Sequence, residues 1–460
     1  MPRRFPPSLL ATALISAACG RGPATVPAPA RMDAATAVAS FDTAWSRIGA
    51  TYYDTTFRGH DWRELRATFR PLAERATSPI EVRQAIESLF VRLGDSHFYI
   101  VPGDVAQAMR ASSDEESDRP GTTGLEFRLI DERLLVSRVV PGSPAEQAGV
   151  RAGWEVRAIE GVDLIAMLAA RRRLDHARDV RRAGLQIPLR AESATHGAPG
   201  GIVHMRFRRD DGREVQLDVA RAAFDGQVVR YGPLPPQYFA FSHSRHADDR
   251  GCVGVIRFSV WMLPLLPALE GAMDELASCR GIVLDLRGNT GGVAALVMGV
   301  SGFFVDRPVA LGTLQARGTT LRYLVNPRRS NRRGESVEPY SGALAILVDG
   351  LSASTSEIFA EGMRDIGRVK VFGDTTAGEA LPATLQKLPN GDLLIHAIAD
   401  FHSANGARIE ASGVAPDVVV PMTRRDLLKG RDVALTAALT WVGGARVEAG
   451  ARVTQRTIRP

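Results

Sequence analysis

Ser354 is the residue of this sequence best placed to act as a nucleophile. Residues 348–360 read VDGLSASTSEIFA, and Ser354 stands where a strand-like apolar run gives way to a helical pattern. A serine at the start of a helix is close to the positive end of the helix dipole and to backbone N–H groups that can bind an oxyanion. The alternative is that Ser352, Ser354 and Thr355 only cap the helix.

A glycine-rich turn is the second segment suited to this chemistry. Residues 281–292 read GIVLDLRGNTGG, which predicts a buried strand, a tight turn and then a helix. Backbone N–H groups at the start of a helix have no partner within the helix, so they can stabilise negative charge on a reacting carbonyl oxygen.

These two segments resemble the S41 (tail-specific/C-terminal-processing) family of serine peptidases. The resemblance implies that Ser354 is the nucleophile and that the N–H groups of Gly291 and Thr355 form the oxyanion hole. It also implies a mixed α/β core of the ClpP/crotonase type over residues 225–425. Alternating strand-like and helical runs favour the same fold class. We expect strands at 253–258, 282–286, 344–348 and 369–372 and helices at 264–277, 291–303 and 354–365.

The general base does not follow the family's Ser–Lys pattern. In that branch a lysine lies 25 residues after the nucleophile and a glutamine follows four residues later, whereas this chain has Glu379 and Ala383 there. A glutamate is a poor substitute for a desolvated lysine as a base. The sequence therefore excludes the Ser–Lys mechanism, and Glu379 is left with a hydrogen-bonding or gating role near the site.

The chain is more similar to the Ser–His–Glu branch, which includes chlamydial protease-like activity factor and tricorn-type enzymes. The resemblance implies that His97, in the segment GDSH, is the base and that Glu410, in RIEASGVAPD, stabilises it. Imidazole titrates near neutrality, and a carboxylate behind it fixes the tautomer. The alternatives are that His97 only holds its turn, that Glu410 is a surface ion-pair partner, and that His396 or His402 is the base.

Two further regions precede the core. Residues 37–110 read as mainly helical, and the third helix ends at Gly94, which places Asp95, Ser96 and His97 on a turn. Residues 111–120 are a polar linker. Residues 120–222 resemble a PDZ domain through the segments GSPAEQAGV and GWEVRAIEG, with an arginine-rich stretch inserted near 170–200.

A PDZ domain binds a peptide C-terminus as an added strand and holds its carboxylate with backbone N–H groups. The resemblance assigns those donors to Gly124 and Leu125. Alternatively, the domain serves only as a structural gate over the active site.

The N-terminus is typical of exported bacterial proteins. Arg3 and Arg4 precede a short apolar run and then small residues up to Cys19, so residues 1–19 read as a signal peptide with a lipobox-like end. The alternative is a plain secretory signal. We expect lipidation of Cys19, residues 20–36 as a tether, and a periplasmic enzyme anchored to the outer membrane. Export also favours a disulfide between Cys252 and Cys279 over two free thiols.

The remaining features constrain the partners. The net charge is +6, but the arginine clusters lack interleaved aromatic residues, so nucleic-acid binding has little support. The histidines do not have metal-ligand spacing, and no cofactor is implied. We expect a C-terminal helix and tail over 426–460.

The predicted function is an exported serine endopeptidase acting on peptides or unfolded proteins. The alternatives are a catalytically degenerate peptide-binding module and hydrolysis of a non-peptide ester or amide.

Overall fold

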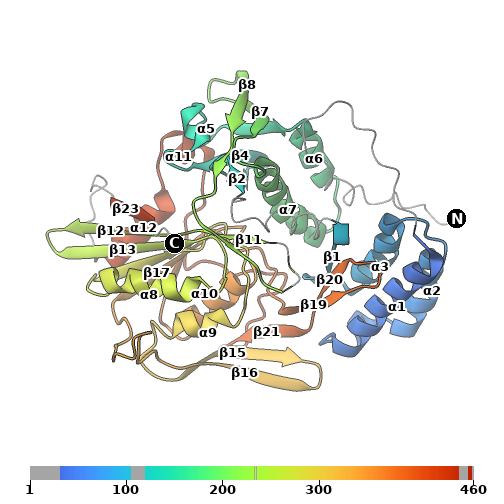
Figure 1. Ribbon diagram of the computed structural model, residues 1–460. Helices are drawn as coiled ribbons and strands as arrows, with labels where there is room; N and C mark the ends of the chain where they lie inside the picture. Colours follow the sequence, from blue (N-terminus) through green and yellow to red (C-terminus); the bar gives the residue numbers. More distant parts are fainter. Residues whose placement is uncertain (1–31, 105–119, 233, 235, 445–453, 458–460) are drawn as a thin grey trace.

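The structure, a computed structural model, describes residues 32–104, 120–232, 234, 236–444 and 454–457. The predicted signal peptide, Cys19, most of the tether and most of the linker at 111–120 lie outside the described residues. Within the described part of the chain, no helix is long and apolar enough to cross a membrane. Figure 1 shows an N-terminal group of helices, a middle unit and a large α/β core.

The N-terminal region packs three helices around one apolar cluster. They are α1 (Ala34–Thr51), α2 (Trp62–Glu74) and α3 (Pro79–Leu93), with the 3-10 turn η1 (Phe57–Gly59) between the first two. Helix α3 begins at a capping box formed by Ser78 and Glu81, and it ends at Gly94, whose φ of 72° is in the left-handed region. The predicted turn at 95–97 therefore follows directly.

Strand β1 fastens this region to the core. β1 (Tyr99–Val101) pairs with β20 (Leu393–Ala397), which also pairs with β19 (Ala383–Lys387). Leu381, Leu388 and Leu394 complete the apolar cluster of the helices. Because β1 starts two residues after His97, this pairing fixes the 95–97 turn against the C-terminal half of the chain.

The middle unit is an antiparallel sheet with its own core. Its strand order is β3-β4-β5-β7-β8, so β3 lies at one edge. The bounds are β3 (Leu125–Ile130), β4 (Arg133–Val139), β5 (Glu155–Ile159), β7 (Ile202–Arg208) and β8 (Glu214–Ala220). Of its smaller strands, β6 (Val162–Asp163) pairs with β5, and β2 (Gly121–Thr122) pairs with β9 (Ala222–Ala223). The next two strands, β10 (Gln227–Val229) and β11 (Gln237–Phe239), pair with each other and bury Val229 and Phe239 in the cluster of the core.

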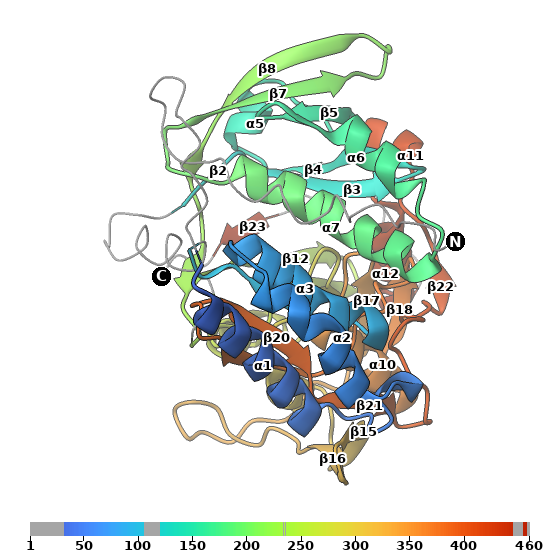
Figure 2. The same cartoon turned by 90° about the vertical axis from the view of Figure 1, so that its right-hand side faces the viewer.

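The arginine-rich stretch near 170–200, expected as a polar insertion, is largely helical. It contains α7 (Ala177–Thr195), which follows α5 (Pro144–Gln147) and α6 (Leu164–Arg171). Ala183, Ile187 and Ala191 recur every four residues and are buried in the core of the middle unit. Figure 2 shows α7 between the strands of the middle unit and helix α3.

The core is built on a seven-stranded sheet of order β22-β18-β17-β14-β13-β12-β23. Strands β13, β14, β17, β18 and β22 are parallel, while β12 is antiparallel to β13 and β23. Their bounds are β12 (Phe241–Asp248), β13 (Gly251–Phe258), β14 (Gly281–Asp285), β17 (Ala343–Val348), β18 (Lys370–Gly373), β22 (Val418–Val419) and β23 (Thr454–Thr457).

Both faces of this sheet are covered. Ile282 and Leu284 of β14 pack in the cluster that holds α8 (Leu265–Leu276), α9 (Leu296–Ser301) and α10 (Thr355–Asp365). Val283 points the other way, toward α12 (Val433–Val442). Burial on both faces explains why the core strands are continuous apolar runs. A smaller sheet joins β15 (Val309–Ala316), β16 (Thr319–Val325) and β21 (Ala399–Ser403), and α11 (Arg424–Leu428) precedes α12.

Two features of the core bear on the sequence predictions. The helix expected at 291–303 begins only at Leu296, because Gly291 and Gly292 have φ values of 99° and 143° and continue the turn. Cys252 and Cys279 form a disulfide beside neighbouring strands, across a sequence separation of 27 residues.

Candidate active site

Ser354 lies on a sharp turn immediately before α10. Its backbone has φ 55° and ψ −116°, which is unfavourable for a residue with a side chain and is kept only where the surroundings hold it. The Ser354 N–H donates to the Glu379 carbonyl at 2.8 Å and to the Glu357 carboxylate at 2.9 Å. The Ser354 side chain is half-buried.

His97 approaches Ser354 from the N-terminal region. Its Nε2 lies 3.2 Å from the Ser354 Oγ, although 257 residues separate the two in the sequence. His97 also has a left-handed backbone, with φ 57°. Burial lowers the pKa of His97 to about 4, so its imidazole is neutral at physiological pH and can accept a proton.

Glu410 is close to this pair but does not contact His97 directly. Its carboxylate accepts three hydrogen bonds, from the Ser96 N–H, the Ser96 hydroxyl and the Ala380 N–H, each at 2.9 Å. Burial raises the pKa of Glu410 to about 7, although these hydrogen bonds oppose the shift. Glu410 is only 6% exposed, so the suggestion of a surface ion-pair partner is wrong.

Ser96 bridges the two, and the sequence analysis gave it no role. Its Oγ lies 2.8 Å from the His97 Nδ1 and donates to the Glu410 Oε2. The Ser96 hydroxyl has one proton and donates it to Glu410. Toward His97 its oxygen can therefore only accept a hydrogen bond, which requires a proton on Nδ1. This leaves the Nε2 of His97 without a proton, facing Ser354. The only sequence signal for Ser96 is its position beside His97.

The two predicted oxyanion donors differ in the structure. The N–H of Thr355 has no acceptor among the described residues, whereas the N–H of Gly291 donates to the Asn289 Oδ1 at 3.0 Å. A Cβ on Gly291 would lie 2.7 Å from the Ser354 Cβ, so only glycine allows this approach. In this conformation Thr355 is the available donor, and Gly291 must exchange its acceptor to join it.

A set of hydrogen bonds fixes the glycine turn against α10. The side-chain amide of Asn289 donates to the Phe258 carbonyl at 3.0 Å, and the backbone carbonyl of Asn289 accepts from the Ser356 hydroxyl at 3.0 Å. The Trp261 indole N–H donates to the same hydroxyl at 2.9 Å. These contacts place the turn beside the first residue of the helix.

The other candidate bases lie elsewhere. His396 is buried in β20, where its Nε2 contacts the Thr51 hydroxyl at 2.8 Å. His402 lies on β21, with its Nε2 3.5 Å from Asp400. Neither histidine contacts Ser354.

Glu379 contributes its main chain to the site. Its carbonyl accepts from Ser354, and its N–H donates to Glu357 at 3.0 Å. Burial raises the pKa of its carboxyl group, an effect that Arg182 and Arg181 of α7 partly offset. The chain has three lysines, Lys370 in β18, Lys387 in β19 and Lys429 after α11, and no described contact joins any of them to Ser354.

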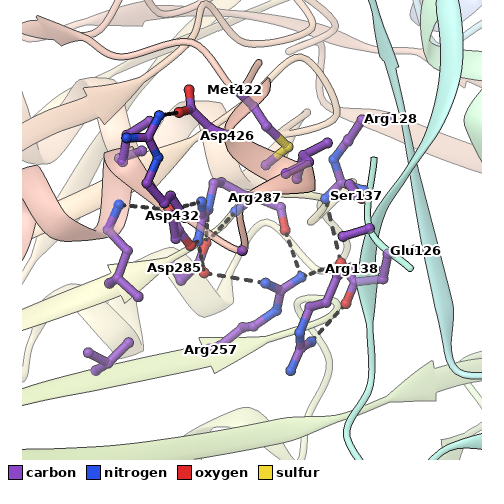
Figure 3. Close-up of a pocket in the computed structure, with 18 of the residues that line it drawn as sticks. Glu126, Arg128, Ser137, Arg138, Arg257, Asp285, Arg287, Met422, Asp426 and Asp432 are labelled. Atoms are coloured by element: carbon purple, nitrogen blue, oxygen red, sulfur yellow. Dashed lines mark hydrogen bonds and ion pairs between the residues drawn. The ribbon is translucent and has the colours of Figure 1, made fainter. Parts of the chain in front are cut away.

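Charged residues join the middle unit to the core around a cavity of about 430 Å³ (Figure 3). Arg257 bonds to Glu126 at 2.7 Å, while the Nε of Arg128 bonds to Asp349 at 2.6 Å. Burial opposes the ionisation of Glu126, but Arg257 and Arg138 outweigh it and lower its pKa to about 2. Ser354, His97 and Glu410 do not line this cavity.

Asp349 extends this contact toward the nucleophile. It lies five residues before Ser354, and its second oxygen accepts from the N–H groups of Gly288 and Leu351 at 2.9 and 3.0 Å. Strand β3 of the middle unit is therefore connected through Arg128 to the loop that holds Ser354.

Comparison with known proteins shows which families the chain resembles. Residues 252–420 match the sequence profile of peptidase family S41, and residues 34–90 match that of the tricorn protease C1 domain. Over these residues the core of the chain is similar to peptidase family S41. The chain is a serine-type peptidase of the kind that includes C-terminal-processing proteases, as the resemblance indicated. Among the described residues, no group of three or more His, Cys, Asp or Glu side chains could hold a metal ion.

The similarity to C-terminal-processing proteases covers most of the chain. A carboxyl-terminal-processing protease of Picosynechococcus sp. is 25% identical over 386 residues, which cover 82% of each chain. A chloroplastic C-terminal processing peptidase of Tetradesmus obliquus is 26% identical over 387 residues, covering 82% of this chain and 76% of the relative.

Solved structures show the same fold. The photosystem II D1 C-terminal processing protease has a TM-score of 0.56 at 22% identity, covering 84% of this chain and 93% of its own. Mature CPAF has a TM-score of 0.55 at 14% identity, covering 92% of this chain and 99% of its own.

Proposed function

We propose that this S41 peptidase hydrolyses peptide bonds with Ser354 as nucleophile, His97 as general base and Glu410 acting on His97 through Ser96. The observation that carries the proposal is the 3.2 Å approach of the His97 Nε2 to the Ser354 Oγ, with the opposite ring nitrogen bonded to Ser96. A nucleophile, a base within hydrogen-bond reach and a group that orients the base are the parts that acyl transfer by serine requires.

The geometry accounts for each proton. Ser354 attacks the scissile carbonyl while its hydroxyl proton passes to the Nε2 of His97. The resulting imidazolium keeps its Nδ1–H on Ser96, whose hydroxyl is bonded to the negative carboxylate of Glu410. The Thr355 N–H, joined by a reoriented Gly291 N–H, stabilises the tetrahedral oxyanion. The imidazolium then protonates the leaving amine, and water repeats the sequence on the acyl-enzyme.

The middle unit supports a PDZ-like role in binding peptides. Strand β3 is at the edge of its sheet, and an edge strand can pair with an extended peptide. A Cβ on Gly124, which has φ 78°, would lie 2.3 Å from the Ser143 Cβ, so glycine is required where the carboxylate-binding turn begins. The Gly124 N–H donates to the Thr122 hydroxyl at 3.2 Å, so a peptide carboxylate bound there would replace that acceptor. The role of Leu125 as the second donor stays a prediction.

Export with a lipid anchor at Cys19 remains part of the proposal. The signal-like order of residues 1–19 motivates it, and the disulfide between Cys252 and Cys279 supports it, because such bonds persist mainly in oxidising compartments. Globomycin-sensitive processing, together with labelling by radioactive palmitate in the wild type but not in Cys19→Ala, would test the anchor. Palmitate labelling of Cys19→Ala equal to wild type would disprove it.

One experiment tests the chemistry. The chain without residues 1–19 is incubated with a fluorophosphonate probe and with casein, alongside Ser354→Ala and His97→Ala. We expect the wild type to be labelled and to degrade casein, Ser354→Ala to do neither, and His97→Ala to lose at least a hundredfold in rate. An unlabelled wild type would instead indicate a degenerate peptide-binding module. Labelling without casein cleavage would favour a non-peptide ester or amide as substrate.

A further inference from the structure

Asp95, the residue before Ser96 and His97, is also fixed by hydrogen bonds. Asp95 is on the same turn, and its carboxyl side chain is only 7% exposed. One carboxylate oxygen accepts from the hydroxyls of Tyr52 and Tyr53 at 2.5 and 2.6 Å, and the other accepts from Arg58 at 2.5 Å. Three donors from the end of α1 and from η1 therefore converge on this carboxylate.

The same cluster reaches the segment that carries Glu410. The Arg408 Nη2 lies 3.1 Å from the Tyr53 hydroxyl and 3.8 Å from the Asp95 carboxylate. Its Nε donates to Asp400 at 2.5 Å, and its Nη1 donates to the Glu410 carbonyl at 3.5 Å. Arg408 thus touches the Tyr53 hydroxyl, which bonds to Asp95, and also the backbone of Glu410.

We propose that Asp95 is a positioning residue for the base: its carboxylate clamps the 95–97 turn to α1 and, through Arg408, to the Glu410 segment. The inference rests on the proposed function of His97 and Glu410. His97 has a left-handed backbone, which is kept only where the surroundings hold it. The clamp keeps the Nε2 of His97 in line with Ser354 and Ser96 in line with Glu410.

The charge of Asp95 adds a second, measurable effect. Burial is the main reason that the pKa of Glu410 is raised to about 7, and the negative charge of Asp95 contributes in the same direction. The charged and titratable groups that face Asp95 are Tyr52 and Tyr53, which directly follow α1, Arg58 of η1, and Arg408, Asp400 and Glu410 of the core. Removing the negative charge leaves Arg58 and Arg408 less neutralised, which also favours the ionised form of Glu410.

The test compares Asp95→Asn with Asp42→Asn in the chain without residues 1–19. Asp42 is a matched control because it pairs with Arg66 and Arg70 in the same helical region without touching the turn. Two properties are measured: kcat and KM on casein-derived fluorogenic peptides between pH 5 and 9, and amide hydrogen exchange of the peptide spanning 94–98.

For Asp95→Asn we expect kcat to fall ten- to a hundredfold with KM unchanged, because a misplaced base affects only the chemical step. The acidic limb of the pH–kcat profile should move to lower pH, and exchange at 94–98 should accelerate at least tenfold. Asp42→Asn should match wild type within twofold in all of these.

Unchanged exchange in Asp95→Asn would overturn the clamp, as would faster exchange with an unchanged kcat. Equal losses in the two variants would show a general effect on the helical region and would also overturn it. If the wild type has no activity, the proposed function fails, and the exchange comparison still decides whether Asp95 holds the turn.

Discussion

The hydroxyl of Ser96 separates His97 from Glu410, lying 2.8 Å from the His97 Nδ1 and 2.9 Å from the Glu410 Oε2. The carboxylate therefore orients the imidazole indirectly. In a direct triad the carboxylate bonds to the ring itself and fixes its tautomer. Here the same result depends on one serine proton pointing toward Glu410, so the state of the carboxyl group controls the state of the base.

Replacing Ser96 with alanine should break this connection. In Ser96→Ala nothing holds the Nδ1 proton of His97, and we expect kcat to fall about a hundredfold, within the range attributed to general acid–base catalysis. The measurement is kcat and KM on a fluorogenic peptide. Ser88→Ala is the matched control, because the Ser88 hydroxyl only bonds to the Gln84 carbonyl within α3. Wild-type activity in Ser96→Ala would show that Ser96 is not part of the relay.

The pH dependence of activity should follow Glu410 and not His97. The pKa of His97 is lowered to about 4 and that of Glu410 is raised to about 7, both mainly by burial. Above pH 5 the imidazole is already neutral, so Glu410 is the group of the site that still titrates. Once Glu410 is deprotonated, its carboxylate accepts the hydrogen bond that the Ser96 hydroxyl donates. We expect kcat to rise through a midpoint near pH 7 and then to level off.

Glu410→Gln provides the check on that assignment. The amide cannot titrate, so this variant should be slow and should show no midpoint near pH 7 in the same kcat measurement. A wild-type profile that is flat above pH 5 would contradict the proposal, because it would mean that only His97 is titrated. A midpoint near pH 7 that survives in Glu410→Gln would assign the titration to another group.

The fold was largely predictable because its signals are local. Strand β14 is buried on both faces, so residues 281–284 form a continuous apolar run that can be recognised without knowledge of its neighbours. The predicted start of α9 was too early, because a strand-turn-helix pattern does not show how many residues a turn with two glycines contains. The sequence did not predict α7, because its buried residues Ala183, Ile187 and Ala191 are interspersed with arginines and because Pro188 lies inside the helix.

The site was predictable only where its chemistry lies within one segment. Ser354 and its glycine turn are recognisable from short motifs, and His97 and Glu410 came from resemblance. Ser96 is different, because its role arises from contact with Glu410, 314 residues away in the sequence. The acceptor of the Gly291 N–H also depends on how the Asn289 side chain is turned, which the sequence does not encode locally.

The carboxyl group of Glu379 should be dispensable. Its main chain holds Ser354 and Glu357, and no described hydrogen bond joins its carboxylate to His97 or Ser354. We expect Glu379→Gln to keep kcat within threefold of wild type on the fluorogenic peptide. Glu379→Pro, which removes the N–H that bonds to Glu357, should lose activity. A large loss in Glu379→Gln would instead give the carboxylate a direct part in the reaction.

Glu357 should make stability depend on pH. It is fully buried and accepts from Ser354, Gly378, Glu379 and Thr376, and burial raises its pKa to about 7. The unfolded state then releases its proton at lower pH than the folded state. This contribution is fully present below the unfolded pKa near 4.5 and is lost as the pH rises to 7, which amounts to roughly 3 kcal/mol.

Glu357→Gln isolates this effect, because glutamine resembles the protonated acid and does not titrate. Urea unfolding at pH 5, 6, 7 and 8 should show the wild type losing stability relative to the variant as the pH rises. Comparing the two chains cancels the contributions of other titrating groups, among them His97, whose lowered pKa acts in the opposite direction. Parallel stability curves for the two chains would rule out a raised pKa at Glu357.

The disulfide between Cys252 and Cys279 should contribute substantially to stability. It closes a loop with a sequence separation of 27 residues, and the chain-entropy account of cross-links gives about 3.5 kcal/mol for a loop of that length. In the chain without residues 1–19, which lacks Cys19, we expect the double variant Cys252→Ala and Cys279→Ala to lose about this amount in urea unfolding. Dithiothreitol should lower the stability of the wild type toward that of the double variant and leave the variant unchanged. A wild type indifferent to reductant would mean that the bond does not form in solution, and one support for export would be lost with it.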